Sequence, residues 1–396
     1  MSLSTLLPAM TRLDELLSEG AAYAQARERR ELDRLTDGTE GIVLFGAGNL
    51  GRKIQRVLHR NGADALAFAD NNQSLWGSSI EGIPVFSPRE AASRFGSSAA
   101  FVISIWGVGS QDRMASRAQQ LKDLGCRTVL PFAPLAWKYS AGLLPHQMVD
   151  LPHKVHRGAD EIQTVYNIWA DEFSRTEYLA QLRWRLLGDF DSMADPVGGE
   201  TYFPEDLFST GDREVFFDCG AFDGDTVASF LGATHGRFSE IVAFEPDPEN
   251  YAKLNRMVDG LATSVRGRIK THRKAVGGSD GIVRFDARGT DGSAIGSGDS
   301  EVECIALDSV VNSIAAPTFI KMDIEGAEPS ALLGASRTIA RHSPILAICA
   351  YHQQDHLWRI PALIHKLNPA YRLYLRPHRI EGWDSVCYAV PPERVL

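Results

Sequence analysis

The sequence predicts an α/β protein with two Rossmann-like, doubly wound domains joined by a helical connector. Three observations support this fold class. Short apolar segments alternate with helical segments between residues 41 and 130, and again from residue 214 to residue 390. A glycine-containing turn follows the first apolar segment of each region, at residues 46–51 and 220–224. The chain has 396 residues, more than one hydrophobic core usually supports.

These patterns divide the chain into four parts. They are an N-terminal helical arm (1–37), a Rossmann-like nucleotide-binding domain (38–135), a helical connector (136–212) and a second α/β domain (213–396). In the arm, apolar residues recur every three or four positions from Leu6 to Leu17, which predicts a helix over residues 3–35. Such an arm can pack on its own domain or on a second subunit, so a homodimer is one reading.

The first α/β domain contains five expected strands and three expected helices. The strands are residues 41–45, 65–69, 83–85, 100–105 and 128–130. The helices are residues 52–61, 88–95 and 111–124. In the connector, the spacing of apolar residues predicts one long helix over 160–187, followed by a loop over 195–211.

The second α/β domain contains more expected strands than the first. Those expected for its main sheet are residues 215–218, 241–244, 269–276, 319–322, 345–349, 371–375 and 386–390. A helix is expected at 248–258, and segments 281–285 and 302–307 are expected to pair as a hairpin. The segment 288–300 between them carries four glycines, which is typical of a mobile loop.

Composition and charge restrict the function classes. The net charge of −9 and the pI of about 5.7 argue against binding to nucleic acid, which needs a basic surface. The five cysteines are scattered and never form a CxxC pair, so neither a disulfide framework nor a zinc site is indicated. The N-terminus lacks signal-peptide features, and no apolar run reaches membrane-spanning length. We therefore expect a cytoplasmic protein that acts on a small molecule, without a membrane or nucleic-acid partner.

The second glycine turn, at residues 218–226, has the sequence DCGAFDGDT. Its glycines allow close approach of a ligand, and the helix that follows offers free N–H groups to a carboxylate. The three aspartates in the turn would repel a pyrophosphate and attract the cationic sulfonium and amino groups of S-adenosylmethionine. Glu245 ends the next strand, 21 residues after Gly224, where an acid can accept hydrogen bonds from a ribose.

Several motifs of this half of the chain resemble the FkbM family of S-adenosylmethionine-dependent O-methyltransferases. They are the segments EPDPENY (245–251), KMDIEGAE (321–328) and LLGA (332–335), extended by Tyr351-His352 and by YRLYLR (371–376). The resemblance covers roughly residues 200–390. It implies a class I methyltransferase fold, S-adenosyl-L-methionine as cofactor and a small-molecule hydroxyl acceptor, such as a sugar, a nucleotide-sugar or a polyketide-like metabolite.

The resemblance also implies which residues hold the cofactor. They are Asp218, Gly220, Ala221, Phe222, Gly224, Asp225, Thr226, Phe244, Glu245, Pro246, Lys274, Ala275 and Asp323. The turn would line the methionine part, Glu245 would hold the ribose, and Lys274 and Ala275 would lie near the adenine. Asp323 would face the methyl group and the acceptor.

Methyl transfer to an alcohol requires a general base, because the hydroxyl must lose its proton as it attacks. His352, Asp323 and Glu325 all follow expected strands, at the edge where open α/β sheets bind ligands. His352 is our first choice of base, since an ordinary histidine titrates near pH 7. Glu325 can equally be an acid favoured at a helix N-terminus, and His352 a packing residue. A divalent metal held by Asp323 and Glu325 is an open alternative, but ligand spacing does not signal one, so we assign no metal ligand.

The N-terminal GxGxxG turn gives a second candidate site. Its candidate nucleotide-binding residues are Gly46, Gly48, Asn49, Leu50, Gly51 and Asp70, the last of them 19 residues after Gly51. One alternative function is therefore an NAD-dependent sugar dehydrogenase or epimerase, and another is a protein that binds S-adenosylmethionine or a nucleotide as a signal. The same turn also suits a domain that serves only as a scaffold.

Overall fold

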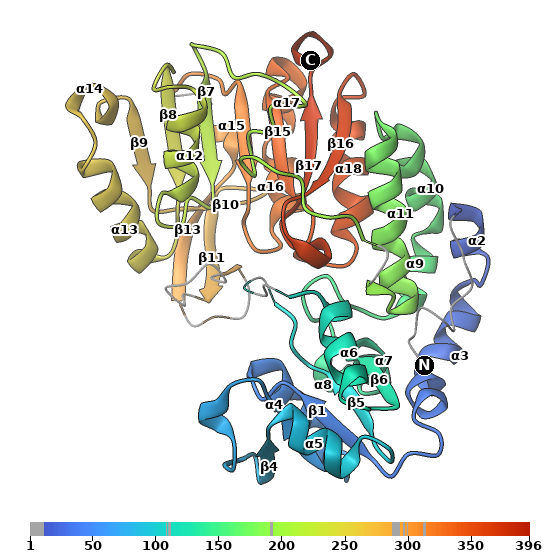
Figure 1. Ribbon diagram of the computed structural model, residues 1–396. Helices are drawn as coiled ribbons and strands as arrows, with labels where there is room; N and C mark the ends of the chain where they lie inside the picture. Colours follow the sequence, from blue (N-terminus) through green and yellow to red (C-terminus); the bar gives the residue numbers. More distant parts are fainter. Residues whose placement is uncertain are drawn as a thin grey trace.

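The chain folds into two α/β domains with helices packed along one side (Figure 1). This computed structural model describes residues 12–396 except 108, 110–111, 191–192, 287–293, 296–297, 299 and 312–313. Within the described residues, no helix is both long and apolar enough to cross a membrane.

The N-terminal domain is built on a six-stranded sheet in the order β3-β4-β2-β1-β5-β6. Its strands are β1 (Ile42–Phe45), β2 (Ala67–Ala69), β3 (Ser79–Ile80), β4 (Ile83–Phe86), β5 (Ala100–Ile103) and β6 (Thr128–Pro131). All neighbouring pairs are parallel except β3 with β4. Helices α4 (Asn49–Arg60), α5 (Pro88–Phe95) and α6 (Met114–Asp123) alternate with the strands. The five expected strands and three expected helices are present, with small changes at their ends.

The C-terminal domain is built on a seven-stranded sheet in the order β16-β17-β15-β14-β7-β8-β9. Its strands are β7 (Val215–Cys219), β8 (Glu240–Phe244), β9 (Ile269–His272), β14 (Phe319–Met322), β15 (Ile345–Cys349), β16 (Arg372–Pro377) and β17 (Ser385–Val390). β7, β8, β9, β14 and β15 are parallel, while β17 runs antiparallel to both of its neighbours. The strand order reverses beside β7, which is where sheets of this kind form a ligand crevice.

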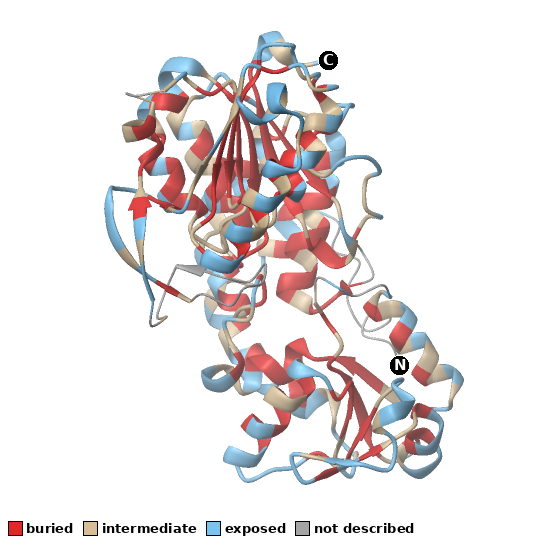
Figure 2. Ribbon diagram, turned by 90° about the vertical axis from the view of Figure 1, so that its left-hand side faces the viewer, coloured by how far each residue is buried: buried red, intermediate tan, exposed pale blue. Residues whose placement is uncertain are grey.

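Helices cover the seven-stranded sheet and bury its central strands (Figure 2). They are α12 (Asp225–Ala233), α13 (Pro248–Asp259), α14 (Thr263–Arg266), α15 (Leu307–Val310), α16 (Glu328–Gly334), α17 (Ser336–His342) and α18 (His356–Leu367). Every residue of β7 and β15 is buried, which is why these segments read as continuous apolar runs.

A smaller four-stranded sheet, in the order β10-β13-β11-β12, corrects one expectation. It contains β10 (Ala275–Val276), β11 (Gly281–Asp286), β12 (Ala294–Ile295) and β13 (Ser300–Ile305). The hairpin prediction is confirmed by the antiparallel pair β11–β13. The single strand expected over 269–276 is wrong, because β9 pairs with β8 while β10 pairs with β13 in the other sheet. Most of the loop expected at 288–300 lies outside the described residues.

The arm and the connector are helical, but each long helix is interrupted. The arm contains α2 (Leu13–Leu17) and α3 (Ala21–Leu35), separated at Gly20, whose φ is +73°. Residues 1–11 of the arm lie outside the described part. The connector contains α7 (Ala133–Lys138), α8 (Ser140–Leu143), α9 (Pro152–Arg157), α10 (Ala159–Ile168) and α11 (Glu172–Leu187). The helix expected over 160–187 breaks because Ala170 N–H donates to the Leu373 carbonyl, 2.8 Å away, and Asp171 caps α11.

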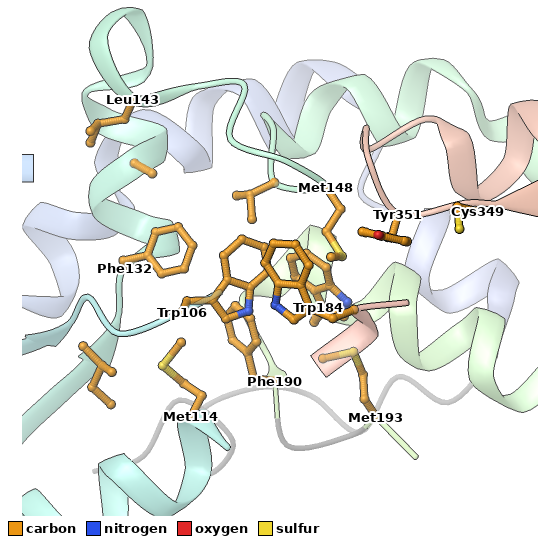
Figure 3. Packing of buried hydrophobic residues seen from close by; sticks show 14 of the residues in the cluster. Trp106, Met114, Phe132, Leu143, Met148, Trp184, Phe190, Met193, Cys349 and Tyr351 are labelled. Carbon is orange, nitrogen blue, oxygen red and sulfur yellow. The ribbon is translucent and has the colours of Figure 1, made fainter. Parts of the chain in front are cut away.

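An aromatic cluster joins the two domains (Figure 3). Trp106, just after β5, packs against Trp383, just before β17, with ring centroids 4.8 Å apart. Trp184 of α11 and Phe190 stack on each other and also contact Trp106. The domains therefore share buried apolar surface, and the N-terminal domain reaches the edge of the C-terminal sheet.

Candidate active site

A cavity of about 570 Å³ lies at the carboxyl ends of β7, β8 and β14. The N-terminal domain contributes Trp106 and Gly107 to its wall, the connector contributes His146 and Gln147, and the C-terminal domain contributes most of the rest. The sequence-predicted site residues that line it are Gly220, Phe222, Asp225, Thr226, Phe244, Glu245, Pro246, Lys274, Ala275, Asp323, Glu325 and His352. Asp218, Ala221 and Gly224 were also predicted, but they are buried and do not line the cavity.

The turn after β7 requires its glycines. Gly220 has a φ of +83°, and a Cβ there would lie 1.9 Å from the Asp323 carbonyl oxygen. Gly224 has a φ of +96°, and its Cβ would lie 2.3 Å from Met257 Cε. Side chains at these positions would clash with backbone and core atoms. The turn thus brings its backbone against the end of β14 and leaves the cavity beside it open.

Glu245 holds this turn from the neighbouring strand. Its Oε2 accepts the Phe222 N–H and its Oε1 accepts the Asp247 N–H, each at 2.9 Å. Burial raises the pKa of the Glu245 carboxyl to about 7, although the two backbone donors favour its charged form. The carboxyl lines the cavity, where a hydroxyl donor can reach it.

Asp218 does not face the cavity as the sequence suggested. It is fully buried, and its Oδ1 lies 3.0 Å from Lys321 Nζ. Lys321 also donates to the Gly220 carbonyl at 2.5 Å. The ion pair of Asp218 and Lys321 therefore holds the turn in position. Burial raises the pKa of Asp218 to about 6 despite the lysine. Asp218 therefore positions the turn, while Asp225 carries negative charge at the cavity wall.

Lys321 was missed as a site residue, although the sequence carried a signal. It is a lysine inside the apolar strand Phe319–Met322, and all four residues of that strand are buried. A charged residue in such a strand must be paired, which points to a partner on an adjacent strand. The parallel register of β14 and β7 places Lys321 directly beside Asp218.

The three predicted catalytic residues lie together at the other end of the cavity. His352 Nε2 is 3.2 Å from Asp323 Oδ1 and 3.5 Å from Glu325 Oε1. Asp323 follows β14 and His352 follows β15, and these strands are parallel neighbours. This pairing explains why residues 29 positions apart meet at one edge of the sheet.

Two residues behind His352 complete the cluster. Glu328, at the start of α16, places Oε1 2.9 Å from His352 Nδ1 and Oε2 3.4 Å from His356 Nδ1. Glu328 is fully buried and accepts the N–H groups of Ile324 and Gly326 at 2.9 and 3.1 Å. Glu328 belonged to a motif noted in the sequence, but no pattern there connected it with His352.

The charges of the cluster perturb each member. Burial by itself would lower the pKa of His352, but Glu328, Asp323 and Glu325 outweigh it and raise this pKa well above its ordinary value. Burial would raise the pKa of Asp323, but His352 and Lys321 hold it well below its usual range. These carboxylates favour the charged imidazole of His352, whereas its choice as general base relied on the pKa of an ordinary histidine. The identity of the base remains a prediction.

Two tyrosines that the sequence did not single out contact the same aspartate. Tyr202 Oη donates to Asp323 Oδ2 at 2.8 Å, and Tyr351 Oη lies 3.5 Å from Asp323 Oδ1. Both tyrosines line the cavity. Tyr202 comes from the loop that joins the connector to β7, so only the tertiary structure brings it to this edge.

The adenine-side prediction is compatible with the geometry. Lys274 and Ala275 both line the cavity, although Ala275 begins β10 of the smaller sheet. Lys274 Nζ lies 2.8 Å from Glu303 Oε2 on β13. This ion pair ties the cavity wall to the smaller sheet.

The predicted nucleotide site of the N-terminal domain lies elsewhere. Gly46, Gly48, Asn49, Leu50, Gly51 and Asp70 are all described, and none lines the cavity. Asp70 Oδ2 accepts the Ala47 N–H at 2.7 Å, so the acid holds the turn in the same way as Glu245 does in the other domain. A Cβ at Gly51 would lie 2.0 Å from the Gly46 carbonyl oxygen, which gives this glycine a packing role. Nucleotide binding here remains a prediction.

Comparison with known proteins adds the family. The model of the methyltransferase FkbM domain matches residues 218–376. The chain contains a methyltransferase FkbM domain. The match begins at the turn after β7 and ends on β16, so it encloses both the turn and the Asp323–His352 cluster. The enzyme class predicted from the sequence, a methyltransferase, is thereby confirmed.

A solved structure agrees with this methyltransferase assignment. The crystal structure of methyltransferase FkbM from Methylobacillus flagellatus KT superposes with a TM-score of 0.76 at 25% identity, covering 95% of this chain and 98% of that chain. A methyltransferase of Podospora anserina covers 72% of this chain and 98% of its own at 13% identity, but its TM-score of 0.28 is too low to support a conclusion. No curated protein matches the sequence at a significant level. The FkbM match confirms the predicted α/β fold class, and it spans the N-terminal domain as well.

Proposed function

We propose that this FkbM-type methyltransferase transfers the methyl group of S-adenosyl-L-methionine to a hydroxyl oxygen of a small molecule. Methyltransferases of this family generally use that cofactor. The observation that carries the proposal is one continuous cavity, lined at one end by the turn 220–226 with Glu245 and at the other by Asp323 and His352. A donor and an acceptor can therefore meet inside a single space.

The residues present fit the cofactor. The glycine turn leaves room that side chains would fill, and Glu245 offers carboxylate oxygens to ribose hydroxyls. When bound, S-adenosylmethionine supplies an electrophilic methyl group on a sulfonium. Transfer breaks the bond from methyl carbon to sulfur and forms a bond from that carbon to the acceptor oxygen. The hydroxyl proton would pass to a base at the acceptor end of the cavity; among the candidates, Glu325 lines the cavity beside Asp323, which Tyr202 and His352 hold in place.

Two measurements test the proposal. Calorimetry with S-adenosylhomocysteine should show one site per chain, weakened by about 1–3 kcal/mol in Glu245→Ala through loss of charge-assisted hydrogen bonds. Isotope-labelled S-adenosylmethionine should then label a hydroxylated acceptor panel of sugars and polyketide-like alcohols. The labelled product should be an ether that survives alkali, unlike a methyl ester. Label found only on nitrogen or carboxylate would refute transfer to a hydroxyl.

The dehydrogenase or epimerase alternative receives less support from the geometry. Its GxGxxG turn lies outside the cavity, and the cavity residues belong mainly to the methyltransferase domain. We therefore retain hydroxyl methylation as the proposed function.

A further inference from the structure

Three side chains at the acceptor end of the cavity converge on one point. These are Asp323, Glu325 and His352, each of which offers a ligand atom within 4.8 Å of the others. We infer that this cluster binds a divalent metal cation that orients the acceptor hydroxyl. Spacing in the sequence does not signal the site, because His352 comes from the neighbouring strand.

Charge is the first reason. Three carboxylates, those of Asp323, Glu325 and Glu328, surround a single imidazole. The buried cation nearest in the fold, Lys321, is already paired with Asp218. The imidazole offers these three carboxylates at most one positive charge, whereas a divalent cation bound beside them supplies two. Buried negative charge without a counter-ion is unfavourable, so the cluster favours the cation.

The orientation of the imidazole is the second reason. Nδ1 of His352 faces the buried carboxylate of Glu328 at 2.9 Å, which leaves Nε2 toward the cavity. A carboxylate behind a histidine in this way is typical of metal ligands, because it fixes the tautomer and the ring. The side chain is 2% exposed, yet neither ring nitrogen makes a well-aligned hydrogen bond to a described residue. Nε2 is therefore a buried nitrogen with capacity for a ligand.

The backbone of Glu325 is the third reason. Its φ is +54°, in the left-handed region that non-glycine residues rarely adopt. Such a conformation is strained and is retained where the surrounding structure requires it, often at ligand sites. Here it carries a carboxylate that is 20% exposed to a position 3.5 Å from His352 Nε2.

The distances suit a small divalent ion. Ligand bonds of 2.0–2.2 Å place neighbouring ligand atoms roughly 3.0–3.5 Å apart. The separations of Nε2 from Oδ1 of Asp323 and Oε1 of Glu325, 3.2 and 3.5 Å, fall in this range. One nitrogen and two oxygen ligands leave positions for a water and for the acceptor. The group Glu328, His352 and His356 is a weaker candidate, since Glu328 and His356 do not line the cavity.

The role of the ion rests on the proposed function. A cation at this point lowers the pKa of a bound hydroxyl, so the acceptor oxygen becomes a better nucleophile. Binding of the ion itself does not depend on methyl transfer and can be measured in the complete protein without an acceptor.

The test uses Mn²⁺, which accepts both carboxylate and imidazole ligands and is visible by electron paramagnetic resonance. Full-length protein is first treated with a chelator, which is then removed by dialysis. Loss of the free-Mn²⁺ signal during titration should show one saturable site per chain. Glu325→Gln should weaken Mn²⁺ binding at least tenfold, and Glu328→Gln by about 10- to 100-fold through loss of histidine orientation.

Asp225→Asn is the matched control, because Asp225 is a carboxylate of the same cavity outside the cluster. It should leave Mn²⁺ binding within twofold of the wild type. Circular dichroism and thermal melting check that each variant is folded. If Glu328→Gln does not fold, Glu325→Gln provides the test, because Glu325 lies at a partly exposed turn. Absence of a saturable site below about 1 mM, or equal weakening by Asp225→Asn, would overturn the inference. S-adenosylhomocysteine binding in chelator is measured in parallel, so a failed metal site and a failed cofactor site give different results.

Discussion

The pH dependence of cofactor binding provides the sharpest prediction, because one carboxyl, that of Glu245, both lines the cavity and titrates near neutrality. Its pKa is about 7, raised by burial. We expect the ribose hydroxyls to donate hydrogen bonds to the charged Glu245 carboxylate. About a tenth of the protein molecules carry this charge at pH 6 and about nine tenths at pH 8. The affinity for S-adenosylhomocysteine should therefore rise about tenfold between these pH values, or ~1.4 kcal/mol.

The perturbation is Glu245→Gln, which keeps the size of the side chain and removes its charge. At pH 8 it should weaken S-adenosylhomocysteine binding by about 1–3 kcal/mol. Between pH 6 and pH 8 its affinity should stay flat, because the titrating group is gone. Isothermal calorimetry at three pH values measures both effects. Glu249→Gln, an exposed acid on the first turn of α13, is the matched control and should behave as the wild type.

Stability must be separated from affinity in this experiment. The Glu245 carboxyl has a higher pKa in the folded than in the unfolded chain. Its stabilising contribution to the free energy of unfolding is therefore fully present below about pH 4.5 and is lost as the pH rises through about 7. Wild-type stability relative to Glu245→Gln should therefore fall across this window, while affinity rises. An equal pH slope of affinity in the wild type and Glu245→Gln would refute the assignment of Glu245 to the ribose.

Three further predictions concern the frame around the site. Gly51→Ala should lower the free energy of unfolding by more than ~1 kcal/mol in urea titrations, because the new Cβ would lie 2.0 Å from a carbonyl oxygen. Gly48→Ala is the control and should change the free energy of unfolding little, because its Cβ would meet nothing within 4 Å. Similar losses in both variants would contradict the packing role. Lys321→Met should lower the free energy of unfolding by about 3–5 kcal/mol at pH 8, since it leaves Asp218 charged and buried without a partner. The loss should be smaller at pH 5, and a loss independent of pH would exclude the charge of Asp218 as its cause. Trp106→Ala should cost about 3–5 kcal/mol by opening the aromatic cluster between the domains, and a loss below ~1 kcal/mol would show that the cluster does not join them.

The sequence by itself determined the alternation of strands and helices, because the signals for these elements are local. The apolar run of β15 predicts a buried parallel strand, and segment 88–95 predicts helix α5, whose start the Ser87 hydroxyl caps in the structure. The glycine turn after β7 and the acid at the end of β8 could also be read directly, because both occupy fixed positions in a βα unit. The same reasoning placed Asp323 and His352 at one edge of the sheet before any contact between them was known.

Three features depend on tertiary contacts, namely the interruptions of the long helices, the split of segment 269–276 and the raised pKa of His352. Ala170 leaves its helix to pair with Leu373, more than 200 residues later, and helical periodicity cannot show such a partner. An isolated histidine has an ordinary pKa, whereas three carboxylates from the end of β14 and the start of α16 raise the pKa of His352. Trp106 reaches the cavity through contacts between two domains. In each case the deciding interaction joins residues distant in sequence, so its energy depends on a fold that local patterns only partly specify.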